Sequence, residues 1–281
     1  MKCSSAKRRR LTDLAVRLFA QVASLLALGA LVWILFEVLR RGGSALSLSL
    51  LTKGPTPPGV PGGGFGNAVL GSLLMTFLAT VIGVPLGLLA GIYLAEYGGG
   101  SKLADLIRLG ANILMGVPSI IVGVFVYAVL VVPMGHFTGY AGAISLAIIM
   151  FPVIARSSGD ILALVPASLR EAALALGVPR WRVTLGIVFR AAKSGLITAC
   201  LLAVARISGE TAPLLFTALN SPYWPTTLNG PTANLTVTIF NYAMSPYEDW
   251  KNQAWAASLL IMLGVLVLAK GTRFLLARRR D

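Results

Sequence analysis

An arginine and a glutamate four residues apart are the residues of this sequence best suited to bind a charged ligand. Arg206 and Glu210 lie in an otherwise apolar stretch, residues 194–216. Arg206 follows Ser194 by twelve residues, which on a helix places it about 18 Å from that residue, near the middle of a bilayer. An arginine at that depth costs about 2.5–3.5 kcal/mol on insertion scales, and such residues usually serve a function.

The guanidinium group of Arg206 presents a planar set of donors that matches a tetrahedral oxyanion. On a continuous helix, Glu210 would lie one turn later on the same face. Two interpretations follow: an anion site that faces a translocation path, or a structural Arg206–Glu210 ion pair that offsets the cost of its own burial. Ser208 and Thr211 are candidate hydroxyl contacts to the same anion, although hydroxyls in helices more often bond to their own backbone.

A second candidate site is a short polar segment between two apolar stretches, residues 163–193. It contains the helix formers Glu171, Ala172 and Ala173. Gly177, followed by valine and proline, predicts an abrupt end to that helix. The alanines give a small, smooth surface with one carboxylate, which suits insertion into a cleft of another protein and the transmission of rigid-body motion. The alternative is an ordinary helical hairpin that joins two spans.

The chain that positions these residues has the composition of an integral membrane protein. Of its 281 residues, 56% are hydrophobic and 12% are charged, and the mean hydropathy is +0.81. A soluble domain of this size does not need so much apolar surface. Because a spanning helix takes about 20 mostly apolar residues, we expect an all-α protein with six spans, at residues 14–39, 67–95, 113–132, 141–162, 194–216 and 254–276.

The distribution of basic residues predicts how these spans are oriented. With the N-terminus inside, the inner segments hold nineteen of the 24 Lys and Arg residues and the outer segments hold four. Because inner segments collect Lys and Arg, we expect both termini in the cytoplasm, as a basic tail at 1–13 and a short tail at 277–281. The same distribution explains the net charge of +14 without a nucleic-acid partner.

The outer segments and the third span carry weaker signals. Residues 40–66 are rich in Gly and Pro and lack the Gly-Lys-Ser/Thr ending of a phosphate loop, so we expect a flexible outer linker. The aromatic residues of the outer segment 217–253 indicate either an interfacial belt or a docking face for an external partner. Residues 96–112 are a candidate interfacial helix, and Pro118 predicts a break or kink at the entry to the third span.

The polar segment 163–193 resembles the EAA loop of the membrane subunits of ABC importers. That motif reads E-A-A-x-x-x-G, nine residues, then I-x-L-P, and this chain matches it at Glu171, Ala172, Ala173, Gly177 and Ile187. It departs at the end, where Phe189-Arg190 stands in place of Leu-Pro. The resemblance covers roughly residues 63–275. It implies the type I importer permease (MetI-like) fold, with the E-A-A-x-x-x-G residues in a coupling helix that docks on an ATPase subunit.

The stretch from Ala205 to Thr217 resembles the permease subunits of the phosphate-specific ABC importer, and among these its A-type subunit. Residues 63–65, 67–76 and 91–97 also fit that subunit. The resemblance implies import of inorganic phosphate across the bacterial inner membrane, with this chain as half of a pore formed with a homologous permease. It also implies a cytoplasmic ATPase dimer, an external phosphate-binding protein that is periplasmic or lipid-anchored, and surrounding membrane lipid.

The expected position of Arg206 and Glu210 on one helix face suggests separate roles for the two charged residues. Arg206 would attract the phosphate. Glu210 would balance the arginine when the path is empty, and would accept a hydrogen bond from the proton of hydrogen phosphate, which sulfate lacks at neutral pH. The sequence has no nucleotide-binding motif, so we expect no catalysis, cofactor or metal in this chain and ATP hydrolysis on another one. Two alternatives stay open: a permease for sulfate, molybdate or phosphonate, and a role in signalling the phosphate supply alongside transport.

Overall fold

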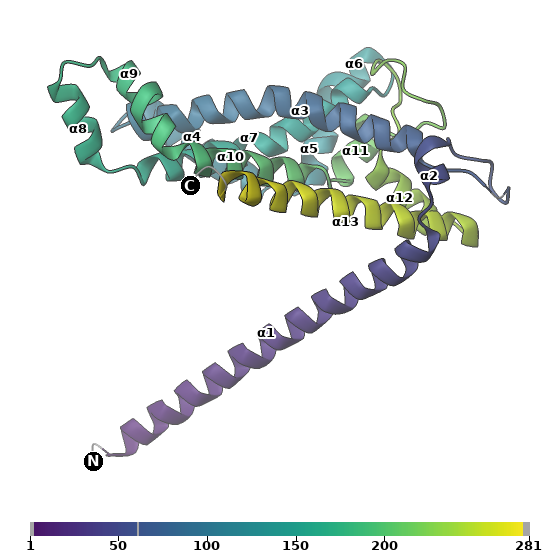
Figure 1. The fold of residues 1–281 in the computed structure, drawn as a ribbon, viewed down its shortest axis with the longest axis horizontal. Helices are drawn as coiled ribbons and strands as arrows, with labels where there is room; N and C mark the ends of the chain where they lie inside the picture. The colour runs from purple at the N-terminus through teal and green to yellow at the C-terminus, as the bar shows by residue number, and fades with distance from the viewer. Residues whose placement is uncertain (1–2, 61, 278–281) are drawn as a thin grey trace.

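The structure is a computed structural model that describes residues 3–60 and 62–277, and the side chains of residues 8–60 and 62–270. The expected tail 277–281 lies outside this range apart from Ala277. Every regular element in these ranges is helical (Figure 1). In chain order the elements are α1 (Cys3–Ala45), α2 (Leu48–Thr52), α3 (Gly66–Ile92), η1 (Tyr93–Tyr97), α4 (Lys102–Gly116), α5 (Ser119–Val126), η2 (Tyr127–Val131), α6 (Val132–Met134), α7 (Gly139–Ala163), α8 (Ala167–Ala175), α9 (Arg180–Val183), η3 (Thr184–Val188), α10 (Phe189–Ile207), α11 (Ala212–Thr217), α12 (Leu235–Ala243) and α13 (Glu248–Ala277).

Several of these helices have the length and composition of membrane spans. Five qualify on their own: Arg8–Ala45, Gly66–Tyr97, Gly139–Ala163, Arg180–Ile207 and Glu248–Lys270. A sixth is obtained if the bent pair Lys102–Gly116 and Ser119–Met134 counts as one span. The predicted all-α membrane architecture is therefore confirmed, and the six predicted spans correspond to five single helices and one bent pair.

The third span is divided differently from the stretch 113–132 that the sequence suggested. α4 begins at Lys102 and takes in most of the candidate interfacial segment, and the chain then bends by 105° into Ser119–Met134. The break at Pro118 was predicted and is confirmed. Val117 has an extended backbone with φ −74° and ψ 129°, because a proline disfavours the helical conformation of the residue before it.

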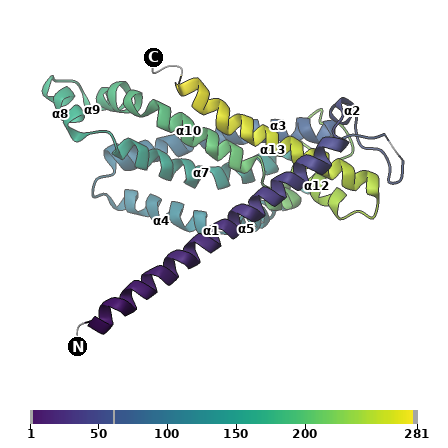
Figure 2. The same cartoon turned by 60° about the horizontal axis from the view of Figure 1, so that its bottom comes forward.

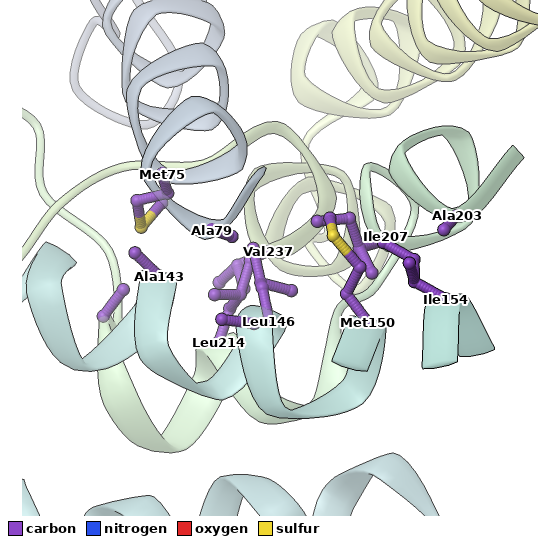
Figure 3. Close-up of a cluster of buried hydrophobic side chains, with 12 residues drawn as sticks. Met75, Ala79, Ala143, Leu146, Met150, Ile154, Ala203, Ile207, Leu214 and Val237 are labelled. Atoms are coloured by element: carbon purple, nitrogen blue, oxygen red, sulfur yellow. The ribbon is translucent and has the colours of Figure 1, made fainter. Parts of the chain in front are cut away.

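The bundle is built around α3 and α7, which pack against each other more extensively than any other pair of elements. Glycines on α3 allow this close approach: a Cβ on Gly91 would lie 1.9 Å from the Oγ of Ser158. Side chains from α3, α7 and α10 then fill a common core (Figure 3), whose largest fully buried members include Met75, Leu146, Met150, Ile154 and Ile207. This core holds α10 in place beside α7, which fixes the position of the residues at the end of α10.

Helix α1 diverges from the bundle for most of its length (Figure 1). In the turned view of Figure 2 it passes in front of the other helices. It touches the rest of the molecule near its C-terminal end, where Gly42 packs against Trp255 and Leu259 of α13 and the Arg41 guanidinium lies 5.2 Å from the centre of the Trp255 ring. None of its most apolar window is buried within the chain. Its apolar surface is therefore left for lipid or for another subunit.

The two ends of the bundle differ in character. α8 and α9 form one end, and α2 and α12 lie at the opposite end (Figure 1). At that opposite end Tyr242 stacks on Trp250 with ring centres 4.6 Å apart, whereas Tyr223 and Trp224 are 78% and 45% exposed. The aromatic residues of segment 217–253 are thus split between a packed cluster and an exposed surface, which both interpretations of the sequence allow.

Candidate functional site

Arg206 and Glu210 lie at a break between two helices. Arg206 is in the last turn of α10, and Glu210 lies in the turn between α10 and α11. The prediction that Glu210 follows one helical turn later on the same face is therefore wrong. Two residues explain the break. Gly209 lowers helix stability, and Pro213 has no N–H to bond the carbonyl of residue 209.

A cavity of about 300 Å³ joins this break to the break between α4 and α5. Arg206 and Glu210 line it together with Leu114, Met115, Gly116, Val117, Pro118, Ser119, Val122, Ile149 and Val153. The helices that follow the two breaks touch closely, since a Cβ on Gly123 of α5 would lie 2.6 Å from the Cα of Pro213. Non-helical backbone at membrane depth is tolerated where it is buried in protein or lines a water-filled cavity, and both breaks line this one.

The charges in the cavity are not paired with each other. None of the ion pairs among the described side chains includes Arg206 or Glu210, so the interpretation as a structural ion pair finds no support in this geometry. Arg206 is exposed and Glu210 is half-buried. The backbone carbonyl of Glu210 accepts a hydrogen bond from the Thr236 hydroxyl at 2.8 Å, which ties the turn to α12. The guanidinium group is thus available to an anion that enters the cavity.

The two hydroxyl candidates do not line this cavity. The Ser208 hydroxyl donates to the carbonyl of Val204 at 2.8 Å, the local backbone bond that serines in helices often make. Ser119 lines the cavity instead. Sequence reasoning missed it as a site residue, although the predicted break at its neighbour Pro118 was a usable signal, because a broken span exposes polar backbone and side chains.

The segment with the second candidate site forms the far end of the bundle (Figure 1). On α8, Glu171 and Ala172 are exposed, and Ala173 is 5% exposed and packs inward. Gly177 has φ +77° and its N–H donates to the carbonyl of Leu174 at 2.9 Å, so the predicted helix end is confirmed. α8 therefore presents one carboxylate and an alanine on an open surface, as a docking helix requires.

Sequence reasoning also missed Glu96, at the end of the second span. Its carboxylate pairs with the Arg170 guanidinium of α8 at 2.7 Å, across 74 positions of sequence. No local pattern signals a contact of that separation. Among the described residues, no group of three or more His, Cys, Asp or Glu is placed to hold a metal ion.

Comparison with known proteins identifies the family. Residues 83–281 match the model of the binding-protein-dependent transport system inner membrane component. The chain is 50% identical to the phosphate transport system permease protein PstA of Yersinia pestis, over 98% of this chain and 93% of that protein. It is 48% identical to the PstA protein of Haemophilus influenzae, over 92% of each chain.

Solved structures share the fold at lower identity. The MetNI methionine ABC transporter, in an inward-facing conformation, matches with a TM-score of 0.59 and 22% identity, over 76% of this chain and 93% of that chain. A bacterial alginate ABC transporter matches with a TM-score of 0.61 and 15% identity, over 89% and 92% of the two chains. The predicted ABC importer permease fold is thus confirmed. The chain belongs to the family of binding-protein-dependent transport system inner membrane components, and within it to the PstA phosphate transport system permeases.

Proposed function

We propose that this chain is the membrane-spanning subunit of an ATP-driven importer that carries inorganic phosphate across the inner membrane. The observation that carries the proposal is the cavity between two broken helices, which holds the unpaired Arg206 and Glu210. The names of the relatives, which are phosphate transport system permeases, agree with an oxyanion as the substrate.

The two charged residues of the cavity have different tasks in this proposal. The Arg206 guanidinium binds phosphate oxygens through its fork of donors. Glu210 keeps the cavity from holding the anion too tightly, because its negative charge opposes a second one nearby. Its carboxylate also accepts a hydrogen bond from the proton of hydrogen phosphate, which favours phosphate over sulfate. Ser119, on the opposite break, is placed to contribute a hydroxyl.

The exposed surfaces and the family support a proposal for the partners. Glu171, Ala172, Ala173 and Gly177 dock on an ATPase dimer, which hydrolyses ATP on separate chains. A homologous permease completes the pore, and an external phosphate-binding protein, periplasmic or lipid-anchored, delivers the substrate at the end that carries α2 and α12. In the proposed assembly both chain termini lie in the cytoplasm, as the distribution of basic residues suggests.

A phosphate-uptake assay on the complete complex tests the proposal. Membrane vesicles that hold wild type or Arg206→Gln are supplied with ATP and radiolabelled phosphate, and ATP hydrolysis is recorded in parallel. Uptake by Arg206→Gln is expected to collapse while assembly and hydrolysis persist. Arg156→Gln is the matched control, because Arg156 is exposed, lies outside the segment 163–193 and is absent from the cavity. Equal uptake by Arg206→Gln and wild type would contradict a role in the anion path.

Two alternatives are separated by further measurements. Competition by sulfate, molybdate or phosphonate during uptake tests for a different oxyanion, and Glu210→Gln should lower the preference for phosphate over sulfate. A role in reporting phosphate supply is separated by assembled variants that no longer transport. If such a variant still signals, signalling and transport are distinct functions of the complex.

A further inference from the structure

A buried ion pair connects the exposed hairpin of the bundle to the end of the second span. Glu96 lies in η1, the π-helical turn that ends that span, and its side chain is 6% exposed. Arg170 of α8 is 21% exposed and faces it. The Arg170 Nη2 lies 2.7 Å from Oε1, and its Nε lies 3.1 Å and 3.3 Å from the two carboxylate oxygens. This fork-on-fork arrangement is the most directional form of ion pair.

The other donors of Arg170 reach the end of α7. Its Nη2 also donates to the carbonyl of Leu162 at 2.8 Å, and its Nη1 donates to the carbonyl of Val165. Carbonyls at the end of a helix have no partner within the helix, and a positive charge there is favoured by the helix dipole. A single side chain of α8 therefore joins the ends of both α3 and α7.

The second half of the hairpin is tied to the same turn. Arg180 of α9 donates from Nη2 to the backbone carbonyl of Glu96 at 2.5 Å. Its guanidinium also lies 5.3 Å from the centre of the Tyr97 ring, within the range of a cation–π contact. Arg170 and Arg180 precede and follow Gly177, the residue at which the hairpin turns. Both helices of the hairpin are therefore bonded to Glu96.

We infer that the Glu96–Arg170 pair is the rigid connection through which movement of α8 reaches the transmembrane bundle. This inference rests on the proposed function, in which α8 docks on an ATPase. α8 packs mainly on its own hairpin, α9 and η3, and its Ala173 joins a hydrophobic cluster that includes Leu162 of α7. The ion pair adds a directional link from α8 to η1, the turn that ends the second span. Separating a buried pair leaves uncompensated charge in a medium of low dielectric. The hairpin and the ends of α3 and α7 therefore move as one body.

The connection leads toward the cavity. α7 packs along α3 and carries Ile149 and Val153 in the cavity wall. A displacement at the Arg170 end of α7 is therefore carried along this helix to residues that line the cavity together with Arg206. Glu96 and Arg170 are positioning residues on this reading, since neither lines the cavity that holds the anion.

The test compares two rates in the same vesicles, which contain the complete complex with wild type or Glu96→Gln. Glu96→Gln is expected to lower phosphate uptake by at least about fivefold, the lower end of usual coupling between sites, while ATP hydrolysis stays within about twofold of wild type. ATP hydrolysed per phosphate imported then rises. A merely structural role would lower both rates in proportion to the amount of assembled complex, and that result would overturn the inference, as would an unchanged ratio.

Asp105→Asn is the matched control. It makes the same change of carboxylate to amide in the ion pair with Arg108, on the neighbouring α4, where Asp105 is 73% exposed and the pair distance is 3.4 Å. No change in ATP hydrolysed per phosphate is expected, because exposed pairs contribute little. The wild-type complex distinguishes failure of the proposed function from failure of this inference. If wild type takes up no phosphate, the proposed function is refuted. If Glu96→Gln hydrolyses as much ATP per imported phosphate as wild type, only the role of the ion pair is refuted.

Two further variants keep the test decisive if Glu96→Gln does not assemble. Arg170→Lys retains a positive charge near Glu96 but loses the fork that reaches the carbonyls of α7. It is expected to raise ATP hydrolysed per phosphate in the same direction, and a wild-type ratio in an assembled Arg170→Lys complex would overturn the inference. The double variant Glu96→Gln with Arg170→Gln should be no worse than the worse single variant, because the two side chains act as one unit. Independent, additive losses would contradict this.

Discussion

Two arginines of this chain have opposite surroundings. Arg170 bonds a buried carboxylate and two helix-end carbonyls, whereas Arg206 takes part in no ion pair among the described residues and lines a cavity. The first arginine uses its donors to hold three segments together, and the second keeps its donors available. The two arginines therefore differ in how many of their donors are used within the protein, which is the difference on which the two proposed roles rest.

The largest expected effect concerns the stability of the fold. Glu96→Leu removes one partner of a buried pair and leaves the Arg170 charge uncompensated, which should lower the free energy of unfolding by about 3–5 kcal/mol. Arg206→Leu should not lower it, because Arg206 takes part in no ion pair among the described residues and a charge at membrane depth is itself costly. Thermal unfolding of the purified complexes measures both. Equal losses for the two variants would erase the contrast between the two arginines.

The next effect concerns transport. Arg206→Lys keeps the charge in the cavity but loses the planar fork, and hydrogen bonds to charged groups are worth about 1.5–3 kcal/mol. Phosphate uptake at low concentration should therefore fall by about tenfold or more. Initial uptake rates over a range of phosphate concentrations check this, with Arg156→Lys as the control at an exposed arginine outside the cavity. If Arg206→Lys takes up phosphate with wild-type kinetics, a positive charge is sufficient for transport and the planar guanidinium is not required.

A smaller effect is expected where the two broken helices touch. Gly123→Ala would place a Cβ 2.6 Å from the Cα of Pro213, and such overpacking costs about 1–3 kcal/mol. The temperature of thermal unfolding and the rate of phosphate uptake should both decrease, because the cavity walls are pushed apart. Gly110→Ala on α4 serves as control, because nothing lies within 4 Å of a Cβ there and alanine favours a helix. If both variants behaved alike, the contact between α5 and α11 would not shape the cavity.

The smallest effect concerns the turn of the exposed hairpin. Gly177 has φ +77°, and an alanine in that left-handed conformation costs about 1–2 kcal/mol. Gly177→Ala should lower ATP-driven uptake modestly through a misplaced α8, and Gly177→Asn should be milder, because asparagine tolerates this conformation better. Co-purification of the ATPase subunit with each variant measures the docking. A stronger loss with asparagine than with alanine would contradict the backbone explanation.

Parts of both regions could be predicted from the sequence. The exposed helix of the hairpin and its end at Gly177 follow from helix formers and a glycine before valine and proline. The break at Pro118 follows from the chemistry of proline. The break after Ile207 was missed, because a long apolar stretch suggested one continuous span and concealed the joint effect of Gly209 and Pro213. For this reason the prediction of a shared helix face for Arg206 and Glu210 was wrong.

The sequence by itself determined what can be read from composition and local chemistry: a helical membrane protein, the family of its permease fold, and two charged residues in an apolar stretch. Only the tertiary structure decided which groups meet. It brought the break before α5 to the break before α11, and it brought Glu96 to Arg170. The physical reason is that hydropathy and propensity act over a few neighbouring residues, whereas a cavity wall or a buried ion pair depends on how whole helices pack across the bundle.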